Sequence, residues 1–170
     1  MSRLNPPEAR AYVLDTSAVI AGFVPGLLDV EQVTVQEVLE EARSLSSKLE
    51  LETAVRSGRV KVADPSEESL VEVRKKAGET GDKVSATDIR LLALALDLRR
   101  IGKNPELVTD DYAIQNLAKL LDIPYRKVIM PGITKVLKWE MVCPACGRTY
   151  PVTASRCDAC GSRLVRRPRS

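Results

Sequence analysis

Short apolar runs alternate along the chain with longer segments in which apolar residues recur every three or four positions. The runs at residues 12–14, 60–63, 107–109 and 125–129 have the length and composition of buried strands. The first and third of these runs lie directly before Asp15 and Asp110. The pattern therefore predicts four short strands, two of which end at a carboxylate.

Helical spacing and helix-capping residues mark the segments between these strands. They predict helices that extend to about residues 20, 55, 77, 98 and 121 and begin at Ser17, Thr34, Ser66, Ser85 and Tyr112. The helix from Ser85 is apolar around nearly its whole circumference, so we expect it to be buried on most sides. Alternating strands and helices predict an α/β fold, with a parallel sheet flanked by helices. Ligands bind beyond the carboxyl ends of the strands in such sheets.

All four cysteines lie near the carboxyl terminus in two matched pairs. Cys143 and Cys146 form one pair and Cys157 and Cys160 the other, and a glycine follows each pair. Two Cys-x-x-Cys pairs at this separation have the spacing of a four-thiolate zinc site. Disulfides or a redox pair would not explain two matched pairs without a leftover thiol. We predict one structural zinc ion, because a closed four-thiolate site has no open position for a reactive water.

The composition also changes at the end of the α/β pattern. After about residue 135, cysteine, proline, arginine and short β-like runs replace the aliphatic helices. We expect an α/β domain at residues 1–129 and a linker at 130–138. A small β-type zinc ribbon should follow at 139–165, and a basic tail at 166–170.

The chain contains no histidine. This excludes histidine acid–base catalysis, Ser-His and Cys-His nucleophile pairs and a histidine-ligated catalytic zinc. Carboxylates, with or without metal, remain available, as do lysine, tyrosine and cysteine. No run is long enough to cross a membrane and the first ten residues lack an apolar signal segment, so we expect a cytoplasmic protein.

Charge is unevenly distributed along the chain. Residues 1–125 hold 16 Lys and Arg against 21 Asp and Glu, whereas residues 126–170 hold 10 against 2. An acidic body with a basic end is a common layout of nucleic-acid enzymes. A soluble domain with a basic tail of no function would have the same charge distribution.

Four carboxylates occupy positions from which they could meet in one crevice. Asp15 and Asp110 end predicted strands, and Glu37 and Asp88 lie in the first turns of predicted helices. Asp111 is a nearby fifth carboxylate, and Asp82 is another. Each has an ordinary structural explanation, because acidic residues are common in helix first turns and at the ends of strands.

Two of these positions also fit a helix capping box, in which a Ser or Thr precedes an acidic residue by three positions. Thr34 stands in this relation to Glu37, and Ser85 stands less closely in it to Asp88. As a group, though, the carboxylates have no positive residue in their immediate sequence, so we expect a cation among them. Oxygen ligands suit Mg²⁺ or Mn²⁺, which can activate water and stabilise a phosphodiester transition state without histidine.

The acidic motifs resemble those of PIN-domain nucleases. The resemblance covers residues 1–129 and rests on residues 13–18, the glutamate at the start of the second helix, residues 85–88 and residues 108–111. A PIN domain followed by a four-cysteine ribbon is similar to the Nob family. Those endonucleases trim the 3′ end of the small-subunit ribosomal RNA precursor during ribosome assembly.

The resemblance implies a role for each acidic position. Residues that would hold the catalytic Mn²⁺ or Mg²⁺ are Asp15, Glu37, Asp88 and Asp110, and Asp111 would be a secondary ligand. Hydroxyl groups that would orient them are those of Thr16, Ser17 and Thr109. Because Glu40 and Glu41 follow in the same helix, the identity of the acidic residue there stays open.

The same resemblance implies partners. RNA, as the small-subunit rRNA precursor, would be the substrate, on a pre-ribosomal particle with other assembly factors and without a membrane. Basic side chains near the cysteines would contact the RNA backbone: Arg148, Arg156, Arg163, Arg166 and Arg167. These arginines could instead serve solubility alone.

Three other readings compete with this one. A toxin-type PIN ribonuclease would usually end near residue 129, before the cysteine pairs. A non-catalytic assembly factor that binds precursor RNA through its zinc ribbon would not need the acidic quartet. A zinc-ribbon transcription or protein-interaction module would leave the large amino-terminal domain unexplained.

Overall fold

The computed structural model describes residues 9–21, 23–26, 29–128 and 138–169 of the 170-residue chain. Five parallel strands form the main sheet, in the order β3-β2-β1-β4-β5. Their bounds are Arg10–Leu14 for β1, Glu31–Thr34 for β2, Val60–Val62 for β3, Asn104–Val108 for β4 and Tyr125–Arg126 for β5. The parallel α/β fold predicted from the alternation is confirmed.

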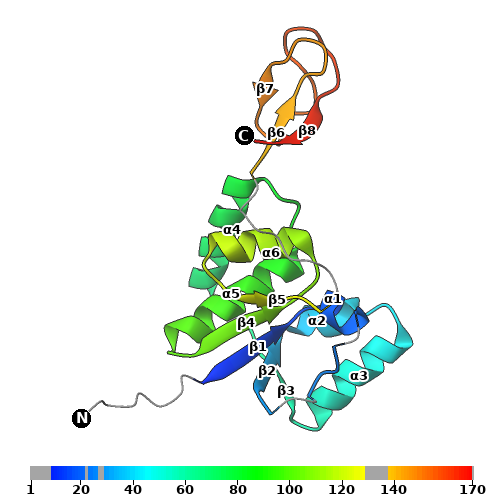
Figure 1. Cartoon of the computed structure of the whole chain (residues 1–170), viewed down its shortest axis with the longest axis vertical. Helices are drawn as coiled ribbons and strands as arrows, with labels where there is room; N and C mark the ends of the chain where they lie inside the picture. The colour runs from blue at the N-terminus through cyan, green and yellow to red at the C-terminus, as the bar shows by residue number, and fades with distance from the viewer. Residues whose placement is uncertain (1–8, 22, 27–28, 129–137, 170) are drawn as a thin grey trace, which may run out of the picture.

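Six helices connect these strands in the described residues (Figure 1). Their bounds are Thr16–Ile20 for α1, Gln36–Glu41 for α2, Leu45–Arg56 for α3, Glu67–Thr80 for α4, Ala86–Arg100 for α5 and Tyr112–Leu120 for α6. None of the described helices combines the length and the apolar composition that crossing a membrane would require.

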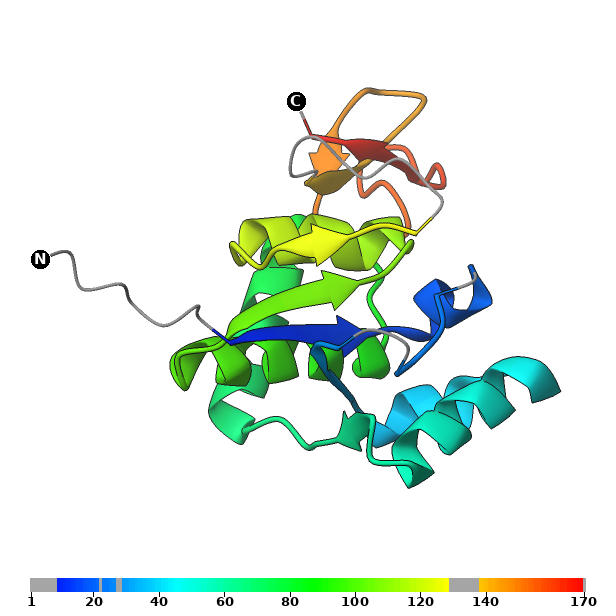
Figure 2. The same ribbon diagram turned by 60° about the horizontal axis from the view of Figure 1, so that its bottom comes forward.

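The core lies on both faces of the sheet. Side chains alternate along β1, so that Val13 joins the larger apolar cluster and Leu14 the smaller one on the other face. The larger cluster is formed mainly with α4, α5 and α6, which lie together against the sheet (Figure 2). As expected, α5 is buried on most sides, and Leu91, Leu92 and Leu96 are almost fully inaccessible. Each such side chain contributes about 1.5–3 kcal/mol by its burial.

Strand β2 was not predicted, because its sequence is polar. Gln32 is 1% exposed and its side-chain oxygen accepts a 2.7 Å hydrogen bond from the Gly26 N–H, which offsets the cost of its burial. Thr34 was expected to cap a helix. Instead its hydroxyl donates to the Leu14 carbonyl at 2.8 Å and so joins β2 to β1. The expected capping box at Thr34 is wrong for this reason.

The single helix expected at residues 34–55 is two helices, α2 and α3. The first ends at Glu41, and Ser44 caps the second by accepting a 3.1 Å hydrogen bond from the Ser47 N–H. A serine hydroxyl competes for backbone donors in this way, so it favours a helix start over a helix interior. The break leaves α2 as a short element of six residues beside α5.

The cysteine-rich segment forms a second, antiparallel sheet with strand order β7-β6-β8. Its strands are β6 Trp139–Val142, β7 Thr149–Tyr150 and β8 Val165–Pro168. The basic tail expected at residues 166–170 therefore begins as strand β8, whose backbone pairs with β6 although its side chains are exposed and show no apolar alternation. The expected linker at 130–138 lies outside the described residues, except for Lys138.

Candidate active site and metal centre

The main acidic site lies at the carboxyl ends of the two central strands. Asp15 follows β1 and Asp110 follows Thr109 at the end of β4. These strands are neighbours, with Leu14 opposite Val108, and the Asp15 N–H donates to the Val108 carbonyl at 3.1 Å. Parallel strands end at one edge of a sheet, so the fold places both carboxylates there, as the strand pattern predicted.

Asp15 is a buried carboxylate held in one orientation. It is 6% exposed, and one of its oxygens, Oδ2, accepts hydrogen bonds from Ser17 Oγ at 2.6 Å and Thr109 Oγ1 at 2.7 Å. Burial raises the pKa of Asp15, the nearby charge of Asp111 raises it further, and the two hydroxyls lower it. The hydroxyls therefore favour the charged form that burial disfavours.

The same hydroxyls also fix the chain that follows β4. Ser17 Oγ accepts from the Asp110 N–H at 3.0 Å, and Thr109 Oγ1 accepts from the Asp111 N–H at 3.1 Å. Asp110 Oδ1 accepts from the Val128 N–H at 2.9 Å, and Asp111 Oδ1 caps α6. Ser17 and Thr109 thus make hydrogen bonds of the kind expected of residues that orient the carboxylates.

Thr16, also expected to orient the site, differs from its neighbours. Its hydroxyl oxygen is buried and has no hydrogen-bond partner among the described residues. A buried polar atom normally has a partner. An orphaned oxygen on the residue that follows Asp15 is therefore consistent with a site completed by an ion, its water or a ligand.

Asp88 approaches the same edge from the first turn of α5. It forms a capping box with Ser85, in which each side chain accepts a hydrogen bond from the backbone N–H of the other residue, at 2.8 and 3.1 Å. Burial raises the pKa of Asp88, and the charges of Asp15 and Asp111 raise it further. Asp15, Asp88 and Asp111 thus share one electrostatic environment. None of these three carboxylates forms an ion pair within the described residues.

Glu37 does not share that environment. Its Oε1 lies 2.7 Å from Nε of Arg90, whose Nη2 lies 2.7 Å from Oδ1 of Asp64. The expectation that no positive residue would neutralise the carboxylates is wrong for Glu37. Arg90 follows Asp88 by two positions, so the neutralising charge lies on the neighbouring helix.

Glu41, from α2, contacts the start of α5, which the sequence pattern did not reveal. Its Oε1 accepts a hydrogen bond from the hydroxyl of Thr87 at 2.5 Å, and Thr87 directly precedes Asp88. Glu37 and Glu41 are one helical turn apart and so lie on the same face of α2. Spacing alone could not decide between them, whereas the contacts with Arg90 and Thr87 distinguish them.

The four cysteines form the tightest group of possible metal ligands. Their sulfur atoms all lie within 4.8 Å of one another, and no other group of three or more acidic or cysteine side chains in the described ranges is as close. Gly147 and Gly161 follow the two pairs with left-handed φ angles of 75° and 71°, and their N–H groups donate to the Cys143 and Cys157 carbonyls at 2.9 Å. These matching turns aim four free thiols at one point, which can hold a metal ion such as zinc.

The arginines expected to bind RNA have different environments. Arg148, Arg156 and Arg163, called the ribbon arginines below, are exposed. Arg167 pairs with Glu140 at 2.9 Å. Arg166 instead donates to the Gly81 carbonyl at 2.6 Å, so its guanidinium is turned toward the amino-terminal domain.

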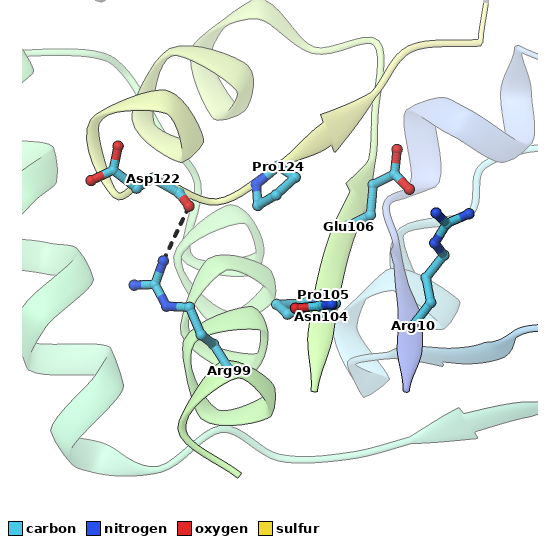
Figure 3. Close-up of a pocket in the computed structure, with 7 residues that line it drawn as sticks. All are labelled: Arg10, Arg99, Asn104, Pro105, Glu106, Asp122 and Pro124. Atoms are coloured by element: carbon cyan, nitrogen blue, oxygen red, sulfur yellow. Dashed lines mark hydrogen bonds between the residues drawn. The ribbon is translucent and has the colours of Figure 1, made fainter. Parts of the chain in front are cut away.

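A sizeable cavity lies at the opposite edge of the sheet. It has a volume of about 510 Å³, and residues at the starts of β1 and β4 line it, with Arg99 donating to the Asp122 carbonyl at 3.1 Å (Figure 3). The carboxylate site is at the other ends of these strands. This cavity is therefore separate from the acidic chemistry.

The chain is similar in sequence to known ribonucleases. Residues 12–98 match the family model of the PIN domain of ribonuclease. Endoribonuclease Nob1 of Methanothermobacter thermautotrophicus is 42% identical, with 91% of each chain covered, and that of Methanocaldococcus jannaschii is 40% identical over 93% of this chain and 78% of the relative. Ribonuclease VapC1 of Thermoplasma acidophilum is 34% identical over 91% of this chain and 77% of the relative.

Proposed function

We propose, from the premise that this chain belongs to the Nob1 family of PIN-domain endoribonucleases, that Asp15, Asp88 and Asp110 form its hydrolytic centre. The observation that carries this proposal is the state of Asp15. Its carboxylate is buried, held on one oxygen by two hydroxyls and exposed to the charges of other carboxylates without an ion pair. Such an arrangement is costly unless a cation joins it.

A divalent ion fits the donors present. The available ligands are carboxylate oxygens, which suit Mg²⁺ or Mn²⁺, and the orphaned hydroxyl belongs to Thr16, the residue after Asp15. When bound, such an ion supplies an activated water at neutral pH and stabilises charge on the phosphate. Hydrogen bonds from Ser17 and Thr109 favour the ionised form of Asp15 and hold its Oδ2 in place, and Asp111 adds negative charge while it caps α6.

Glu41 is a better candidate than Glu37 for the fourth carboxylate. Arg90 already matches the charge of Glu37 through Oε1. The other oxygen, Oε2, is buried without a hydrogen-bond partner among the described residues, but a metal ion bound there would lie close to the guanidinium and be repelled by it. Glu41 is exposed and is hydrogen-bonded to the residue before Asp88. We therefore infer that α2 offers Glu41 to the site and that Glu37 positions α5 through Arg90.

The substrate we propose is the 3′ end of the small-subunit ribosomal RNA precursor, bound on a pre-ribosomal particle. Support comes from the Nob1 relatives, which match 91–93% of this chain and therefore extend into its cysteine-rich part. We assign residues 1–129 to the nuclease domain, 130–138 to a linker and 139–165 to a ribbon held by one structural zinc. The exposed ribbon arginines then supply phosphate contacts.

The test is cleavage of a labelled precursor RNA that extends past the mature 3′ end. In Mn²⁺ or Mg²⁺ the wild type should cut at the mature end, and Asp15→Asn should lose cleavage while keeping its fold. Asp29→Asn is the matched control, because Asp29 is exposed and lies before β2, at the opposite edge of the sheet. An Asp15→Asn protein with wild-type cleavage would refute the assigned centre, and cuts scattered over unrelated RNA would refute the substrate.

A toxin-type ribonuclease is the second candidate. Ribonuclease VapC1 aligns with 91% of this chain, so the presence of the ribbon does not by itself separate the two readings. A toxin-type enzyme would cut RNA other than the ribosomal precursor and would be held inactive by a partner protein. The same cleavage assay, with a transfer or messenger RNA as competitor, distinguishes them.

A further inference from the structure

The ribbon contacts the amino-terminal domain through a buried carboxylate outside the catalytic group. Asp82, in the loop between α4 and α5, has a side chain only 7% exposed. Its Oδ1 accepts from the indole N–H of Trp139 at 2.7 Å and its Oδ2 from the Asn116 side chain at 2.5 Å. Trp139 opens the ribbon and Asn116 belongs to α6, so one carboxylate joins three parts of the fold.

Arg166 completes the contact over the face of the indole. Its guanidinium carbon lies 4.3 Å from the centre of the Trp139 ring, and its Nη2 donates to the Gly81 carbonyl at 2.6 Å and lies 3.9 Å from Asp82. A guanidinium stacked on a tryptophan face is a favourable cation–π pair. The carboxylate, the indole and the guanidinium thus form one compensated cluster.

Glycine at position 81 is required by the same contact. Gly81 has a left-handed φ of 68°, and a Cβ there would lie 2.7 Å from a methyl carbon of Val152 in the ribbon. Any larger residue would push the ribbon away as well as strain the backbone. The loop that leads into α5, and so to Asp88, is therefore shaped to receive the ribbon (Figure 1).

A cleft lies beside this cluster, between the ribbon and the start of α6. It has a volume of about 280 Å³, and its lining includes Lys83, Tyr112, Trp139 and Arg166. Tyr112 is 44% exposed and directly follows Asp111. An open aromatic ring with cations nearby is suited to a stacked base and its phosphate.

We propose that Asp82 docks the ribbon on the nuclease domain and that the cleft formed by this docking, with Lys83 and Tyr112 on its wall, holds one nucleotide of the RNA substrate. The nucleotide part rests on the proposed function. Asp82 does not repel the phosphate, because two N–H donors and Arg166 compensate its charge. A volume near the lower limit of ligand pockets, roughly 300 Å³, suits a single nucleotide.

The experiment uses the full chain with its metal-loaded ribbon. Trp139 is the only tryptophan, so intrinsic fluorescence reports its environment directly. Asp82→Ala should move the emission of Trp139 to longer wavelength, because the indole becomes exposed to water. The ratio of docked to undocked ribbon should fall about tenfold or more, as expected for loss of hydrogen bonds to a buried charge. Glu79→Ala is the control, because Glu79 lies three positions before Asp82, at the end of α4, and pairs with Lys76. Unchanged emission in Asp82→Ala would overturn the docking.

The nucleotide site is tested by binding of labelled single-stranded RNA without divalent metal, independently of cleavage. Tyr112→Leu should keep the Trp139 emission and raise the Kd about fivefold or more, the low end of the effect of losing one stacked base. Tyr112→Phe keeps the ring and should restore wild-type affinity. Equal affinity in Tyr112→Leu and the wild type would refute the nucleotide site. Failure of the wild type to cleave RNA would instead refute the proposed function, with the fluorescence result still valid.

Discussion

Removing the hydroxyl of Thr109 should destabilise the protein by an amount that depends on pH. Thr109→Val keeps the shape of a fully buried side chain but deletes the 2.7 Å hydrogen bond to Asp15 and the 3.1 Å bond from the Asp111 N–H. A hydrogen bond to a charged group contributes about 1.5–3 kcal/mol and a neutral one about 0.5–1.5. We expect a loss of about 2–4 kcal/mol at neutral pH.

The sign of the pH dependence follows from the raised pKa of Asp15. In the folded protein Asp15 holds its proton to a higher pH than in the unfolded chain, so ionisation destabilises the fold. Metal-free stability therefore falls as pH rises from the ordinary aspartate range through the raised pKa. The Thr109 hydroxyl limits this fall by favouring the ionised form. Its removal should cost most above the raised pKa and least below the ordinary range, where Asp15 is protonated in both states.

Urea unfolding at pH 7 and at about pH 3, below the ordinary aspartate range, measures this difference without added divalent metal. For a slope of about 2 kcal/mol per molar urea, the midpoint at pH 7 should drop by roughly 1–2 M. Thr34→Val is the matched control, because Thr34 is equally buried but donates to the neutral Leu14 carbonyl. Its cost should be about 0.5–1.5 kcal/mol at both pH values. A Thr109→Val cost that is the same at both pH values would show that the charge on Asp15 is not its cause.

Three further outcomes test the remaining assignments. Glu41→Gln should reduce metal-dependent cleavage far more than Glu37→Gln, and the reverse order in a kcat comparison at saturating Mn²⁺ would restore Glu37 as the ligand. Chelating zinc, or Cys143→Ser, should unfold about residues 142–164 and leave the nuclease domain folded, which circular dichroism and limited proteolysis would report; loss of both domains together would contradict this. Neutralising all three ribbon arginines should reduce the slope of log affinity against log salt by up to about 2, at about 0.7 per phosphate contact on single-stranded RNA. An unchanged slope would show that these three arginines do not contact RNA phosphates.

The parallel sheet and its acidic edge could be predicted because their causes are local. Apolar runs that stop at Asp15 and Asp110 reveal both the strands and the end at which the carboxylates emerge. The buried helix α5 has a continuous apolar surface, and the cysteine pairs have a spacing that few other structures use. Each strand, helix and cysteine pair is marked by its own short stretch of sequence.

The features that could not be predicted depend on contacts between distant residues. Strand β2 can be polar and buried because the side chain of Gln32 accepts a hydrogen bond from the Gly26 N–H. The periodicity of the sequence does not reveal that contact. Strand β8 carries exposed arginines and is held by its pairing with β6. In both cases the hydrogen-bonding partner, rather than the residue type, determines the element.

The charges of the acidic site show the same limit most clearly. Along the sequence, Glu37 and Glu41 are equivalent, since both are acidic and one turn apart on the same short helix. They differ only because α5 places Arg90 opposite one and Thr87, beside Asp88, opposite the other. Those two partners are three positions apart on α5, so the packing of α2 against α5 assigns one carboxylate a cation and the other a hydroxyl. A carboxylate that is not paired with an arginine can bind a metal ion. The tertiary fold, rather than the local sequence, therefore determines which of Glu37 and Glu41 is available to the metal.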